Sequence, residues 1–183
     1  MKKLYISIVL AMAVCVLAEE PKSEGRFDVD GTKDGITLKA DEISEGGWSG
    51  GASWMDAEKN KQYVMANFHA GSDWKKGTFT FTPSKDGNVN VVLRSRWVEN
   101  GGTILWVLID DIKLEGADIV NGDFEKDSSA WTLNGEGNNK ASIVDKGHSG
   151  NAVRVAHDSP AMQTIKVKAN KPVKVTYWFK ATE

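Results

Sequence analysis

The chain is poor in the residues that thiol and metal chemistry use. It has one cysteine, Cys15, and three histidines among 183 residues. Cys15 lies in an N-terminal segment that we expect to be removed, so the remaining chain has no cysteine for a disulfide or a thiol nucleophile. The histidines, His69, His148 and His157, lack the spacing of metal ligands. These absences argue against thiol chemistry and against a histidine-based metal centre.

The chain also lacks an excess of positive charge. It has 23 lysines and arginines against 25 aspartates and glutamates, a formal net charge of −2. Removal of an N-terminal segment that contains Lys2 and Lys3 makes the remaining chain more negative. Nucleic acid and anionic membranes are therefore not expected as its main partners.

The single long apolar run, residues 4–17, is too short to span a bilayer. Lys2 and Lys3 precede it and a small-residue exit, residues 16–18, follows it, which is the pattern of a secretory signal peptide. We expect residues 1–18 to be cleaved and the protein to be secreted, periplasmic or on the cell surface. No membrane contact is expected after cleavage.

Helical periodicity is scarce, and only residues 55–63 offer a competing helix, with Ser53 as a cap. Residues 78–82 (TFTFT) instead place two phenylalanines on one side and three threonines on the other, which predicts a strand. Similar patterns predict strands at residues 35–40, 62–68, 88–98, 104–109, 140–145, 152–157, 163–168 and 173–181. Many short strands separated by turn signals indicate an all-β, antiparallel β-sandwich.

Two motifs suggest a family. Residues 121–125 read Asn-Gly-Asp-Phe-Glu with Trp131 following, and an apolar strand at residues 104–109 runs into IDDIKLEG. These stretches resemble the opening and the closing strand of carbohydrate-binding modules of the family 4 and 9 type. The resemblance, which is best over residues 73–183, implies a galactose-binding-domain-like jelly roll. In this chain the closing motif precedes the opening one.

The reversed order of these motifs leaves two domain organisations open. In the first, residues 19–183 form a single β-sandwich, with residues 119–183 supplying the opening strands and residues 26–116 the later ones. In the second, a small sandwich at residues 25–117 is followed by a truncated second copy at 118–183, which a faint repeat between residues 25–30 and 122–127 supports. We favour the first organisation, because half a sandwich would leave a bare edge strand at residues 173–180.

A sugar site needs flat aromatic rings beside hydrogen-bonding side chains. If Val175, Tyr177 and Phe179 face the core, Trp178 faces outward. A glycine-rich loop carries two more tryptophans, and the strand at residues 88–98 has a polar face. We therefore predict six ligand residues: Trp48, Trp54, Asn90, Arg94, Arg96 and Trp178. The alternative is that these rings pack and the arginines only solvate the sheet. The other tryptophans considered, Trp97, Trp106 and Trp131, are assigned to packing.

The resemblance also implies a structural calcium ion, for which carboxylates are suitable ligands. The predicted ligands are Asp110, Asp111, Asp123 and Glu125, from the closing and opening motifs. The alternative is a hydrogen-bonded aspartate pair that holds a turn.

The function expected from these features is a secreted, non-catalytic carbohydrate-binding module, which could serve a glycoside hydrolase system. A second hypothesis is a cell-surface or assembly protein that binds protein partners. A third is a serine esterase, because residues 47–51 match G-x-S-x-G at Ser49, and Asp110 and His157 follow. That motif has its catalytic meaning only on a strand–turn–helix of a parallel α/β sheet, so no catalysis is expected.

Overall fold

The computed structural model describes residues 23–43, 52–98 and 103–182. The predicted signal peptide, Trp48 and Ser49 lie outside these residues. Within the described ranges, no helix has the length and apolarity that crossing a membrane requires.

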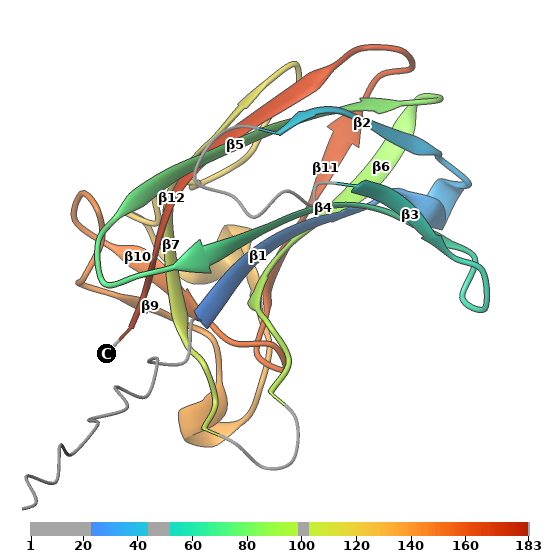
Figure 1. Ribbon diagram of the computed structural model, residues 1–183. Coiled ribbons are helices and arrows are strands. Elements are labelled where there is room, and N and C mark those ends of the chain that lie inside the picture. Colours follow the sequence, from blue (N-terminus) through green and yellow to red (C-terminus); the bar gives the residue numbers. More distant parts are fainter. Residues whose placement is uncertain (1–22, 44–51, 99–102, 183) are drawn as a thin grey trace, which may run out of the picture.

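The described residues form a β-sandwich of two antiparallel six-stranded sheets, which confirms the predicted all-β class (Figure 1). Sheet A contains, in spatial order, β3 (Ala52–Asp56), β4 (Lys61–Ala70), β1 (Ser23–Asp30), β6 (Gly87–Ser95), β11 (Ala161–Val167) and β8 (Thr132–Leu133). Sheet B contains β2 (Leu38–Ile43), β5 (Lys75–Pro83), β12 (Val173–Ala181), β7 (Val107–Glu115), β10 (Ala152–Val155) and β9 (Ser142–Val144). Three short 3-10 helices, η1 (Thr32–Asp34), η2 (Ser128–Ala130) and η3 (Gly137–Asn139), lie in the connections.

Strands from the two halves of the chain are neighbours in both sheets. In sheet A, β11 lies between β6 and β8, and in sheet B, β12 lies between β5 and β7. Figure 1 shows these late strands, in orange and red, among the green and yellow-green strands of the first half. The last strand therefore has hydrogen-bonded partners on both of its sides.

Alternating side chains build the core between the sheets. Phe79 on β5 and both Tyr177 and Phe179 on β12 are fully buried, as the alternation predicts. Their rings meet rings from sheet A: the Tyr177 centroid lies 5.1 Å from that of Phe27 and 5.3 Å from that of Phe68. Burying each such side chain contributes about 2–3 kcal/mol. This aromatic contact fixes which side of each strand faces outward.

The helix weighed for residues 55–63 is absent from the described chain, where β3, a turn at residues 57–60 and β4 form a hairpin. The Asp56 carboxylate accepts a hydrogen bond from the Lys59 backbone N–H at 3.1 Å, and Asn60 adopts a positive φ of 50°. Both features are typical of tight turns. Local turn chemistry and strand pairing therefore outweigh the helical propensity of this segment.

Candidate functional site

Three of the predicted ligand residues, Trp54, Asn90 and Arg94, lie on the outer face of sheet A. The cross-strand register places Trp54 opposite Tyr63, Tyr63 opposite Asp30, and Asp30 opposite Asn90. These four residues form one row across β3, β4, β1 and β6, because opposite residues on paired strands point to the same side of a sheet. The row brings together residues from three separate parts of the sequence: β1, the β3–β4 hairpin and β6.

The row begins with a pair of stacked rings. The centroids of Trp54 and Tyr63 are 4.8 Å apart and their planes differ by 25°. The Trp54 indole N–H donates to the sulfur of Met65, as does the Arg26 guanidinium. Trp54 is 37 % exposed, so part of its ring is open to a ligand. The sheet thus holds a flat aromatic surface in a fixed orientation.

A buried carboxylate positions two arginines beside this row. Arg26 Nε lies 2.8 Å from Asp28 Oδ1, and Arg94 Nη2 lies 2.8 Å from Asp28 Oδ2. Burial raises the pKa of the Asp28 carboxyl, against the opposing effect of Arg94 and Arg26. Arg94 Nε is also buried and has no hydrogen-bond partner among the described residues. The ion pairs with Asp28 therefore hold both guanidinium groups in fixed positions on this face.

We call Trp54, Tyr63, Arg26, Asp28, Asn90 and Arg94 the sheet A site. Its ring pair can stack on the C–H face of a sugar, and its amide and guanidinium groups can hydrogen-bond hydroxyls. Tyr63, Arg26 and Asp28 were not predicted from the sequence. Period-2 alternation in residues 25–30 and 61–68, with polar residues on one face, was a signal that could have identified them.

Trp178 faces outward, as predicted, but from the other sheet. It lies on β12 between the buried Tyr177 and Phe179, so it belongs to the outer face of sheet B. The His148 imidazole stacks on its indole, with centroids 3.9 Å apart and planes 11° from parallel. Trp178 therefore does not join Trp54, Asn90 and Arg94 in one site.

Two of the four predicted calcium ligands, Asp110 and Glu125, accept hydrogen bonds from backbone N–H groups of one loop, residues 147–151. Asp110 accepts from the Asp111 N–H at 2.6 Å and from the Ser149 N–H at 3.1 Å. Burial raises the pKa of Asp110, while these N–H groups lower it. Glu125 accepts from the Asn151 N–H at 2.7 Å. The two motifs of the family resemblance thus meet at the same loop.

These carboxylates do not converge on one point. Asp111 pairs with the His148 ring nitrogen at 3.0 Å, and Asp123 is exposed. Across the described ranges, no three His, Cys, Asp or Glu side chains are grouped so that they could hold a metal ion. The arrangement as it stands does not fit a calcium cage, and calcium binding stays a prediction.

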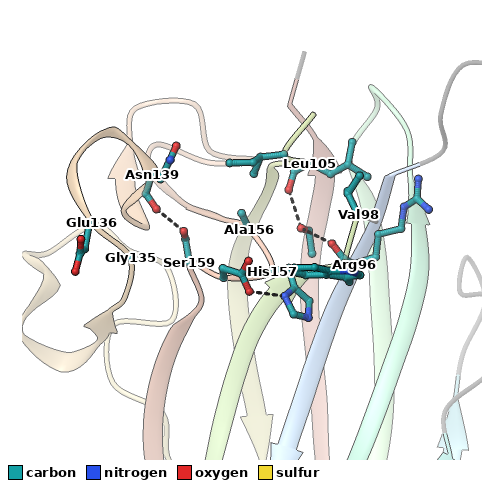
Figure 2. A pocket seen from close by; sticks show the side chains of 13 residues that line it. Arg96, Val98, Leu105, Gly135, Glu136, Asn139, Ala156, His157 and Ser159 are labelled. Atoms are coloured by element: carbon teal, nitrogen blue, oxygen red, sulfur yellow. Dashed lines mark hydrogen bonds and ion pairs between the residues drawn. The ribbon is translucent and has the colours of Figure 1, made fainter. Parts of the chain in front are cut away.

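Arg96 lies beyond the end of β6, at a hollow of about 490 Å³ at one end of the sandwich. Figure 2 shows Val98 and Leu105 on one side of the hollow and Asn139 and Ser159 on the other. The lining comes from four separate stretches of the described chain: residues 95–98, 104–105, 135–139 and 156–159. A concave site of this size can take a small ring-shaped or apolar group.

Trp97, which we assigned to packing, is 55 % exposed at this hollow, so that assignment is wrong. The regular alternation ends with β6 at Ser95, whose hydroxyl donates to the Leu105 carbonyl at 2.6 Å. Trp97 instead contacts the His157 ring at 5.0 Å, edge to face. Trp131 lies in the core, as predicted. Trp106 is half-buried.

Two residues of the esterase hypothesis, Asp110 and His157, have separate partners. His157 Nδ1 lies 2.7 Å from its neighbour Asp158, while Asp110 is occupied by backbone N–H groups of residues 111 and 149. Ser49 lies outside the described residues. The esterase hypothesis thus gains no support from these contacts.

No protein-family model matches the chain, and neither a curated protein nor a solved structure matches it.

Proposed function

We propose that the protein is a secreted, non-catalytic carbohydrate-binding protein and that the sheet A site holds the glycan. The observation that carries this proposal is the stacked pair of Trp54 and Tyr63 on the same face as the Arg26–Asp28–Arg94 cluster. The signal-like segment at residues 1–18 supports export.

Binding at this site combines two contacts. The Trp54 ring packs against the apolar face of a sugar, and Arg94 and Asn90 direct donors at its hydroxyls. Asp28 keeps the guanidinium groups in place before the ligand arrives, which reduces the entropy lost on binding. Hydrogen bonds from charged donors contribute about 1.5–3 kcal/mol each. A reversible, moderate affinity is expected from so few contacts.

Affinity electrophoresis on gels containing neutral soluble polysaccharides tests the proposal. We expect retardation of the wild-type protein by at least one glycan, and about a tenfold weaker interaction for Trp54→Ala and for Arg94→Gln. Trp97→Ala removes an exposed tryptophan at the hollow at the end of the sandwich, away from the sheet A site, and serves as the matched control. Retardation that Trp54→Ala and Arg94→Gln leave unchanged would rule out the sheet A site.

A second candidate function, assembly through protein contacts, has one specific observation in its favour. β3 is an edge strand of sheet A, and its Met55 is 58 % exposed. Unpaired strand edges with apolar side chains promote association. If this function holds, the protein self-associates in sizing experiments, Met55→Lys reduces the association, and no glycan retards the protein.

A further inference from the structure

The outer face of sheet B carries tryptophans and cations in adjacent positions. The register places Arg154 opposite Leu108 and Leu108 opposite Lys180, so these three residues form a row across β10, β7 and β12. The neighbouring row holds Trp178 opposite Lys76. Arg154 and Lys180 are two strand spacings apart, which is about 10 Å between their backbones.

Two of these cations lie over tryptophan rings. The Arg154 guanidinium carbon lies 3.3 Å from the ring centroid of Trp106, and Lys180 Nζ lies 5.2 Å from that of Trp74. Stacking covers the flat face of a guanidinium but leaves the N–H groups at its edge free. Those N–H groups match the two oxygens of a carboxylate or a sulfate.

The acidic residues Asp110, Asp111 and Glu115 of this face already have hydrogen-bond or ion-pair partners within the protein. Asp110 accepts backbone N–H groups, Asp111 lies 3.9 Å from Lys113, and Glu115 lies 3.7 Å from Lys174. These contacts engage two of the lysines on the face. Asp110 lies opposite Trp178 in the neighbouring row, and each of its carboxylate oxygens accepts a backbone N–H.

Arg154, Lys180 and Lys76 therefore have no ion pair within the part of the chain that the structure describes. Burial lowers the pKa of the Arg154 guanidinium, with no acidic partner acting in the opposite direction. A partly desolvated cation without a counter-charge is stabilised by an incoming anion. The sheet A site differs, because both of its arginines form ion pairs with Asp28.

We propose that this face binds an anionic polysaccharide whose carboxylate or sulfate groups pair with Arg154 and Lys180. We call it the cationic face and define it by Trp74, Lys76, Trp106, Arg154, Trp178 and Lys180. It is separate from the sheet A site and takes a different class of glycan. A polysaccharide fits better than nucleic acid, because three unpaired cations on a chain of net charge −2 offer few phosphate contacts.

The test uses the full protein in gels that contain polygalacturonate, dextran sulfate or unsubstituted dextran, at low salt. We expect at least one of the two anionic polymers to retard the protein, whereas unsubstituted dextran should not retard it. Added salt should weaken the retardation. The double variant Arg154→Gln/Lys180→Gln is expected to bind at least about tenfold more weakly, since each substitution removes a charge-assisted hydrogen bond. Both glutamines keep much of the aliphatic stem, and a thermal melt checks that the variant folds.

Lys166→Gln is the matched control, because it removes an exposed lysine from the outer face of sheet A, on β11. Polygalacturonate and dextran sulfate distinguish carboxylate from sulfate recognition. The proposal is overturned if neither polymer retards the protein, if Lys166→Gln weakens binding as much as the double variant, or if single-stranded DNA binds as strongly as both polymers. These outcomes are independent of the sheet A site, which Trp54→Ala and neutral glycans test.

Discussion

Asp28 and Arg94 form an ion pair of 2.8 Å on adjacent strands, with the Asp28 side chain almost completely buried in the outer layer of sheet A. The register places Arg26 directly opposite Arg94. Two like charges opposite each other on paired strands repel, and Asp28 relieves this repulsion by bonding to both. One carboxylate thus permits two guanidinium groups to share the proposed glycan site.

The stability of the fold should depend on the ionisation of Asp28. Because burial raises its pKa in the folded protein, the folded state holds the proton more tightly than the unfolded chain. The stabilising contribution is fully present below the unfolded pKa of about 4 and is lost as the pH rises through the folded pKa. The unfolding free energy of the wild type should therefore fall relative to that of Asp28→Asn as the pH rises from about 3 to about 7.

Urea unfolding of both proteins at a series of pH values measures this difference. The Asn variant cannot titrate at this position, so the comparison isolates Asp28 from the other carboxylates. A difference that moves in the wild type's favour with rising pH would show that the arginines, rather than burial, control its pKa.

Alanine at position 77 should destabilise the fold, whereas alanine at position 71 should leave its stability nearly unchanged. A Cβ at Gly77 would lie 2.5 Å from the fully buried Tyr177 ring, while one at Gly71 meets no atom within 4 Å. Overpacking of this kind costs about 1–3 kcal/mol. We expect Gly77→Ala to lower the free energy of unfolding by that amount and Gly71→Ala to change it by less than about 0.5 kcal/mol. Equal losses in the two variants would contradict the packing of Tyr177 against β5.

Two tryptophan substitutions should differ in their effect on stability. Trp131 is 4 % exposed, packs on Phe124 with centroids 5.3 Å apart, and donates its indole N–H to the Asn121 carbonyl at 3.0 Å. Trp131→Phe loses that hydrogen bond and leaves a cavity, at a cost of about 2–3 kcal/mol. Trp97→Phe, at an exposed ring, should stay within about 0.5 kcal/mol. Chemical denaturation measures the free energy of unfolding of both variants. Similar losses would contradict the difference in burial between Trp131 and Trp97.

Chelation tests the calcium prediction. If an ion bridges Asp110, Asp111, Asp123 and Glu125, removing it with a chelator lowers the melting midpoint, and added calcium restores it. The observed hydrogen bonds offer the other outcome, in which Asp110 and Glu125 only hold the backbone of residues 147–151. An unchanged midpoint would contradict the calcium prediction and support this role.

Uninterrupted alternation identified β12 correctly, but β1 was not predicted, although residues 25–30 also alternate. The strand predicted at residues 173–181 coincides with β12, since four buried side chains alternate there with exposed or partly exposed ones. The strand predicted at residues 88–98 ends at Ser95, and Trp97 leaves the sheet as a result. Strand ends depend on which neighbours continue the hydrogen-bonded ladder, and a local pattern does not contain that information.

The amino-acid sequence by itself determined the all-β class and the side of most strands that faces the core, because period-2 alternation of apolar residues is a local property. It did not determine which strands are neighbours. Only the tertiary structure placed Trp54 beside Tyr63, Asp28 between Arg26 and Arg94, and Trp178 on the opposite sheet. The physical reason is that these placements depend on strand pairing, which for Asp28 with Arg94 and for β12 joins residues far apart along the chain, and packing of the shared aromatic core selects that pairing.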